Sequence, residues 1–186
     1  MYLNCHSYYS LRYGTMSVEQ LVQKAAAAGA ASIALTDINN STAVPEFAGE
    51  CIRNNIQPVT GIEFRNENEM QYIGIARNNK GLREMNEFLS KHNFEKTPIP
   101  FPAPHFSEAY IIYSQIKFPD RKLFDNERIG VRPENINKLL TLPGADRNKM
   151  VILQPVTFAN NDDLFIHKSL RAVDNNILLS HLKPSQ

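Results

Sequence analysis

Residues 33–40 read IALTDINN, and this stretch decides the fold. A short apolar run stops at an acid and two asparagines. That pattern is typical of a buried parallel strand that leaves its sheet into a polar loop. In α/β sheets and barrels, the side chains that carry chemistry lie at the carboxyl ends of the strands. Asp37 therefore holds the position of a candidate site residue.

Two neighbouring stretches share this form. Residues 2–7 read YLNCHS and predict a short strand that ends at His6, and residues 58–64 read PVTGIEF and predict another that ends near Glu63. Because the carboxyl ends of parallel strands meet at one edge of a sheet, we expect His6, Asp37 and Glu63 on the same face. The question for function is whether these three groups form a working site.

The segments between these strands predict helices. Ser17 and Gln20 have the spacing of a capping box, and Gly29 suits the left-handed end of the helix that follows. Residues 42–54 predict a second helix, whose expected inward side chains are Val44, Phe47, Ala48, Cys51 and Ile52. The first 64 residues thus read β-α-β-α-β, which predicts an α/β fold with a parallel sheet.

The remainder of the chain continues the alternation of strands and helices. We expect strands at 72–76, 109–113, 128–131 and 150–153, and helices at 80–91, 133–142 and 162–175. On the last helix, Leu164, Leu170 and Val173 are expected to face inward. Residues 97–105 contain four prolines, which excludes a helix or an inner strand and predicts an extended crossing segment.

Composition limits the class of protein. A length of 186 residues fits one domain, and 42% hydrophobic with 21% charged residues is typical of a globular protein. The net charge of +1 argues against a strongly basic nucleic-acid clamp. Cys5 and Cys51 form no CxxC motif, so neither a disulfide framework nor a structural zinc site is indicated. The chain shows no apolar leader or membrane-length segment, which predicts a cytoplasmic location and no membrane contact.

The three strand-end groups allow two interpretations. A histidine and two carboxylates could bind zinc or manganese, but a catalytic metal needs about three protein ligands and an open position for water. The other four histidines are predicted away from strand ends, so a His-rich cluster lacks ligands. The second interpretation is that His6, Asp37 and Glu63 hydrogen-bond to one another and to loop backbone.

Several motifs, taken in order, resemble a known family. They are LNCHS at 3–7, YSLRYG at 9–14, ALTD at 34–37, GIEF at 61–64, IARN at 75–78 with Gly81, and ILQPVTF at 152–158. This series resembles the PHP (polymerase and histidinol phosphatase) domain, and its wording is most similar to the N-terminal domain of bacterial DNA polymerase III α subunits. The resemblance implies a distorted (β/α) TIM-like barrel over residues 1–182. Residues 183–186 are then a linker or the end of an excised domain.

Active members of this family hold a metal cluster through ligands that the resemblance places on this sequence one by one. The first pair, His-x-His, falls on Asn4 and His6. The aspartate of the first loop falls on Tyr13. The histidine that follows Thr-Asp falls on Ile38.

The family's remaining ligands fall on later positions of this sequence. The family's glutamate is kept as Glu63, and the next histidine falls on Gln71. The cysteine falls near Ile116. The final Asp-x-His pair falls on Pro155 and Thr157.

By this resemblance only His6 and Glu63 remain as ligands, with Asp37 as their neighbour. Ile38 and Pro155 offer no side-chain donor atom to a metal, and neutral amides and hydroxyls are weaker ligands than those they replace. The resemblance therefore implies a degenerate metal site and no cofactor. The alternative is a residual zinc or manganese ion at His6 and Glu63.

The function implied is that of a catalytically inactive N-terminal domain in DNA replication, with a structural and partner-binding role. Its expected partners are the remainder of the polymerase chain and the proofreading exonuclease subunit, and DNA is contacted through the parent protein. That parent would be a DNA-directed DNA polymerase, a nucleotidyltransferase, while the isolated domain would be inactive. Two alternatives stay open: a metal-dependent phosphoesterase or 3′–5′ exonuclease with a reduced metal site, and a free-standing binding module.

Overall fold

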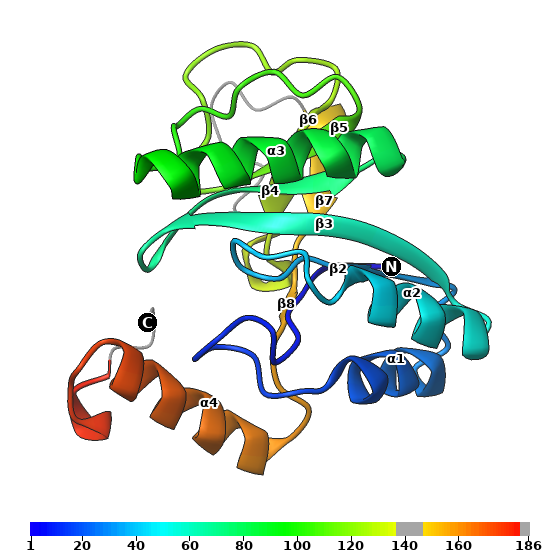
Figure 1. Cartoon of the computed structure of the whole chain (residues 1–186), viewed down its shortest axis with the longest axis vertical. Coiled ribbons are helices and arrows are strands. Elements are labelled where there is room, and N and C mark those ends of the chain that lie inside the picture. Colours follow the sequence, from blue (N-terminus) through cyan, green and yellow to red (C-terminus); the bar gives the residue numbers. More distant parts are fainter. Residues whose placement is uncertain (137–146, 183–186) are drawn as a thin grey trace.

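A computed structural model describes residues 1–136 and 147–182, and its centre is one curled sheet (Figure 1). The strands are β1 (Tyr2–Cys5), β2 (Ser32–Leu35), β3 (Gln57–Asn66), β4 (Glu69–Ala76), β5 (Ala109–Ser114), β6 (Glu127–Val131), β7 (Met150–Ile152) and β8 (Pro155–Val156). The helices are α1 (Val18–Ala27), α2 (Val44–Arg53), α3 (Asn79–Glu95) and α4 (Asn161–Asp174), with the short 3-10 helices η2 (Arg147–Lys149) and η3 (Leu179–His181). Across the sheet the strands follow the order β7-β6-β5-β4-β3-β2-β1-β8. The α/β prediction is confirmed.

The first half of the chain forms the parallel part of the sheet. Strands β8, β1, β2 and β3 pair in parallel, and α1 and α2 are the crossover helices between β1, β2 and β3. The predicted capping box is present, since the Ser17 hydroxyl accepts from Gln20 N at 3.1 Å and the Gln20 side chain accepts from Ser17 N. Gly29 follows α1 with a φ of +69°, a conformation that favours glycine. Local sequence therefore sets both ends of α1.

The middle of the chain reverses direction twice. β3 and β4 form an antiparallel hairpin across Glu67 and Asn68, and β4 also pairs antiparallel with β5. β5, β6 and β7 are then parallel to one another. Two reversals return β5 to the direction of β3. Apart from β4, every strand therefore points its carboxyl end the same way.

The two edges of the sheet are joined by a very short crossing. β7 and β8 lie at opposite ends of the strand order, yet only Leu153 and Gln154 separate them along the chain. Three Cα–Cα steps span at most roughly 11 Å, so the sheet must curl until its edges nearly meet. β8 then pairs with β1, with Asn4 opposite Pro155. This curl gives the barrel-like shape and brings the segment after β8 to the end of β1.

The described residues bury three hydrophobic clusters, the smallest of which holds Ala34, Ile73, Ile75, Ile112 and Leu153. One cluster lies under α3 and the proline-rich segment and includes Ile62, Phe64, Tyr72, Met85 and Ile99. Another lies under α1 and α2 and includes Cys5, Leu21, Val22, Phe47 and Cys51. Leu82, Met85, Phe88 and Leu89 of α3 pack in the cluster that includes Ile62, and residues 97–105 form neither helix nor strand, as expected.

Some inward faces were predicted wrongly. On α2, Ile52 is 71% exposed, while Ala43 just before the helix is buried. On α4, Val173 is 69% exposed and Arg171 is buried in its place, because the guanidinium has polar partners on the barrel side. β3 extends past the predicted end to Asn66, so Glu63 lies within the strand.

Two predictions concern residues that lie wholly or mostly outside the described part of the chain. Most of the helix predicted at 133–142 lies outside the described residues, as does the boundary predicted after residue 182. Within the described ranges, no helix combines the length and apolar character needed to cross a membrane.

Candidate functional site

A buried pair, His6 and Glu63, forms the centre of the site at the carboxyl end of β1 and within β3. Both side chains are fully buried, and His6 Nε2 lies 2.9 Å from Glu63 Oε2. A carboxylate oxygen only accepts, so Nε2 carries the hydrogen. The other ring nitrogen, Nδ1, lies 3.3 Å from Oγ1 of Thr157, which follows β8. One imidazole thus joins three strands of the parallel part of the sheet.

Asn4 holds the same oxygen of Glu63 from a second side. Its Nδ2 donates to Glu63 Oε2 at 3.0 Å, and its Oδ1 accepts the Thr36 hydroxyl at 2.9 Å. The amide therefore presents N–H groups, which have no lone pair for a metal, toward the centre of the site. Its Oδ1 atom, the one that could bind a metal, already accepts the hydrogen bond from Thr36.

Arg65 occupies the second oxygen of Glu63. It lies two positions further along β3, on the same side of the strand, and its Nε pairs with Glu63 Oε1. Burial alone would raise the pKa of Glu63, but the charges of His6 and Arg65 outweigh it and lower the pKa to about 2. Glu63 is therefore ionised, and cationic or polar protein groups occupy both of its oxygens.

Tyr13 lies among four nitrogen-bearing side chains. Its ring makes edge contacts with His6 at 5.1 Å and His167 at 4.9 Å, measured between ring centroids. The guanidinium carbons of Arg65 and Arg171 lie 4.4 Å and 5.2 Å from the same centroid. Such cation–π contacts stabilise buried guanidinium groups. An aromatic ring thus stands where the family resemblance places a metal-binding carboxylate.

The last helix reaches this cluster through polar side chains. His167 Nδ1 donates to the Tyr13 carbonyl at 2.7 Å, and Arg171 bonds to Asp174 at 2.6 Å and to Asn68. Burial lowers the pKa of His167, although its hydrogen bond to Tyr13 acts in the opposite direction. α4 is therefore attached to the barrel mouth by its polar face.

Asp37 serves the neighbouring loop. Its carboxylate accepts from Ser7 N, Ser7 Oγ and Ser10 Oγ, each at 2.7 Å. Burial raises the pKa of Asp37, and these hydrogen bonds only partly oppose that effect. The side chain therefore anchors the loop after β1, and all three of these hydrogen bonds come from that loop.

Asp37→Asn is expected to lower the free energy of unfolding by about 1–3 kcal/mol. The amide can accept with one oxygen only, so at least one donor of Ser7 or Ser10 loses its partner. Urea denaturation followed by circular dichroism measures the change. Ser10→Ala removes one of the three bonds and also the acceptor of the Ile38 N–H, so its cost should be of the same order. Equal stability of Asp37→Asn and the wild type would show that the carboxylate does not anchor this loop.

The remaining residues placed by the resemblance lie outside the hydrogen-bonded cluster. Ile38 donates its backbone N–H to Ser10 Oγ at 3.0 Å, and Gln71 accepts from Lys117 Nζ at 2.8 Å. Pro155 contributes only backbone pairing in β8, and Ile116 is 88% exposed in the turn after β5. Within residues 1–136 and 147–182, no group of three or more His, Cys, Asp or Glu side chains could hold a metal ion.

Three members of the cluster were missed by the sequence analysis: Arg65, His167 and Arg171. Each had a signal. Arg65 follows Glu63 by two residues on a strand, and His167 and Arg171 are four apart on a helix, so each pair shares a face. The polar pair on α4 was overlooked in favour of its apolar residues.

Comparison with known proteins bears on the family and the fold of the chain. The family model described as PHP domain matches residues 3–120. DNA polymerase III subunit alpha of Staphylococcus epidermidis is 25% identical over 187 residues, which covers 96% of this chain and 17% of that protein. Its namesake in Staphylococcus aureus is 31% identical over 93 residues, which covers 48% of this chain and 9% of the protein. The chain thus spans only a small part of these relatives.

A solved structure shares the fold. An amidohydrolase from Chromobacterium violaceum superimposes with a TM-score of 0.52 at 13% identity, covering 87% of this chain and 88% of that one. At this identity the likeness concerns the fold alone.

Proposed function

This chain belongs to the PHP domain family, and from that membership we propose that it is a catalytically silent PHP domain of the kind found in DNA polymerase III α subunits. Its role is then structural and partner-binding, within DNA replication. The observation that supports this proposal is the state of Glu63, whose two oxygens are held by Asn4, His6 and Arg65. A metal would have to displace these groups.

The donor set does not fit a hydrolytic metal cluster. A two-metal hydrolase needs a bridging group and several anionic or imidazole ligands, whereas Ile38 and Pro155 offer no donor side chain. Tyr13 and Arg65 place a ring and a fixed cation beside Glu63, and a fixed cation repels a second one. The site is better suited to hold strands and helix together than to activate water.

The proposed partners follow from the α-subunit relatives. The similarity to these proteins runs along nearly the whole chain, which supports a place beside the remainder of a polymerase chain. The proofreading exonuclease subunit is the second proposed partner, and contact with DNA is made through the parent polymerase. A cytoplasmic location agrees with this role.

The alternative is a phosphoesterase or 3′–5′ exonuclease that uses one zinc or manganese ion on His6 and Glu63. Elemental analysis of the purified domain, expressed with zinc, manganese and iron supplied, separates the two. We expect far less than one ion per chain, and no hydrolysis of a phosphate ester or of a DNA 3′ end.

The matched control is His6→Ala. A tightly held ion in the wild type that is lost in His6→Ala, together with hydrolysis that depends on it, would contradict the silent domain and establish the enzyme. Equal and negligible metal in both proteins supports the proposal.

A further inference from the structure

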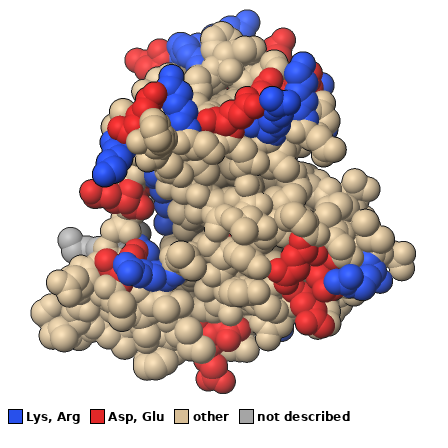
Figure 2. Space-filling model, in the orientation of Figure 1, with Lys and Arg blue, Asp and Glu red and all other residues tan. Residues whose placement is uncertain are grey.

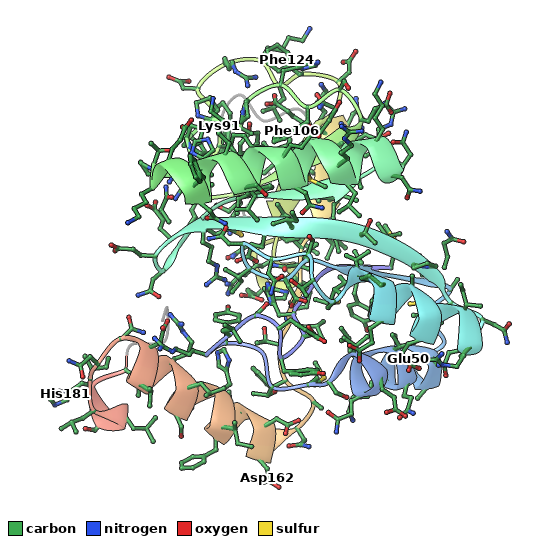
Figure 3. The ribbon with its side chains drawn as sticks, in the orientation of Figure 1. Glu50, Lys91, Phe106, Phe124, Asp162 and His181 are labelled. Carbon is green, nitrogen blue, oxygen red and sulfur yellow. The ribbon has the colours of Figure 1, made fainter. Side chains whose placement is uncertain are left out.

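The outward face of α4 is apolar, although the helix lies at the surface. Phe165 is 62% exposed, Ile166 48% and Val173 69%, and their spacing places them on one side of the helix. His167 and Arg171 lie on the opposite side, toward Tyr13. The helix is therefore inverted, with its polar side against the barrel and its apolar side toward solvent (Figure 3).

The short helix η3 contacts α4 and adds two exposed apolar side chains at the carboxyl end of that helix. Leu178 is 68% exposed and Leu179 41%, and both follow α4 closely in the chain. We call the five exposed side chains on α4 and η3 the α4 face: Phe165, Ile166, Val173, Leu178 and Leu179. In Figure 2 the surface over this region is mostly uncharged, with an acidic group at its lower end, where α4 begins. Isolated exposed apolar residues are common, but a group of five is not.

The size of the α4 face suits a pair of protein molecules. With roughly 150–250 Å² taken as the area of a large apolar side chain, the exposed fractions leave on the order of 500 Å² uncovered. Soluble monomers seldom expose more than a few hundred Å² in one patch, and a stable pair buries about 800 Å² per partner. The apolar face and a polar rim together approach that value.

The two ends of the α4 face carry side chains that can pair with each other, an acid at one end and a histidine at the other. Asp162 lies at the start of α4, and His181 lies on η3 at the other end (Figure 3). In an antiparallel pair with twofold symmetry, the first turn of one helix meets the η3 region of the other, and the reverse contact is identical. Asp162 then faces His181 twice, and the antiparallel helix dipoles attract.

From these observations we infer that the α4 face binds a second copy of this chain, as a symmetric antiparallel pair. The apolar side chains form the centre of the contact, and Asp162 and His181 lie at its rim. This inference is independent of the proposed function, which concerns the buried site at β1 and β3. The metal analysis above neither supports nor weakens it.

Sedimentation equilibrium of the wild-type chain over a wide range of concentrations tests the inference. We expect a reversible monomer–dimer equilibrium. Val173→Asp should raise the dissociation constant about tenfold or more, because it places a charge at the centre of the contact. The matched control is Ile52→Asp, which changes an equally exposed apolar residue on α2 and should leave the equilibrium unchanged.

A charge exchange tests the orientation. Asp162→Lys should weaken the dimer, and adding His181→Asp should restore part of the affinity, because the opposite charges then meet again. Circular dichroism of each variant verifies that it is folded. A wild-type chain that stays monomeric at every concentration overturns the inference, as does a dimer that survives Val173→Asp but is lost in Ile52→Asp.

Discussion

Arg65→Met is expected to lower the free energy of unfolding by about 3–5 kcal/mol, the usual loss when one partner of a buried ion pair is removed. Glu63 is fully buried and ionised, and Arg65 supplies the partner for its Oε1 atom. Methionine keeps much of the side-chain volume but has no charge and no N–H donor. Urea denaturation at neutral pH measures the loss.

The control is the double variant Glu63→Gln with Arg65→Met, which removes both charges. Its stability should lie closer to the wild type than that of Arg65→Met, because no unpaired carboxylate remains. If the single and double variants are equally destabilised, the ion pair is not the source of the effect.

The dependence of stability on pH in the acid range should report on the same interaction. The pKa of Glu63 falls from an ordinary 4.5 to about 2 on folding, so its contribution to stability is complete above pH 4.5. That contribution is lost as the pH falls from about 4.5 toward 2, where the folded carboxylate itself gains a proton. Glu63→Gln should therefore flatten this part of the curve of stability against pH.

Tyr13→Ala is expected to lower the free energy of unfolding by about 2–4 kcal/mol and to loosen α4 from the barrel. The Tyr13 ring contacts Arg65 on β3 and both His167 and Arg171 on α4, so its removal leaves these groups without a common partner. Hydrogen exchange measured by mass spectrometry should show faster exchange over α4, with smaller changes over α1 and α2.

Tyr13→Phe is the matched control, because it keeps the ring that lies against Arg65 and removes only the hydroxyl. The expected cost is about 0.5–1.5 kcal/mol, with α4 still protected from exchange. Uniformly faster exchange in Tyr13→Ala would show that the ring supports the whole fold and has no particular role in holding α4.

The sequence predicted the parallel start of the fold because local signals there agree with one another. A capping box, a left-handed glycine and three apolar runs with polar ends all indicate the same β-α-β-α-β order. Because strand ends in such a sheet converge, the closeness of His6 and Glu63 followed from the order alone. The observed hydrogen bond between them has a length of 2.9 Å.

The orientation of α4 could not be predicted in the same way. The usual rule places apolar residues inward, and it selected Val173, whereas this helix turns Arg171 to the barrel. The reason is the chemistry of the receiving surface, where the Tyr13 ring and carbonyl offer polar and π contacts that only the folded barrel assembles. Helix periodicity gives the two faces of a helix but does not say which face its neighbour requires.

The hydrogen bonds between Asp37 and the loop after β1 could not be predicted from the sequence either. An acid after a short apolar run is predicted to lie at the carboxyl end of a strand, and Asp37 does follow β2. The carboxylate is used by Ser7 and Ser10, a choice set by the turn of the loop after β1, which has no strong sequence signal of its own. Position along a strand is thus easier to predict than the partner of the side chain.

The short crossing from β7 to β8 has a consequence for synthesis on the ribosome. β1 leaves the exit tunnel before β8, yet one of its edges pairs with β8, about 150 residues later. At translation rates of roughly 5–20 residues per second, that edge stays open for about 8–30 s. The nascent chain therefore carries an open strand edge until β8 emerges, and this is the interval in which chaperones can shield that edge.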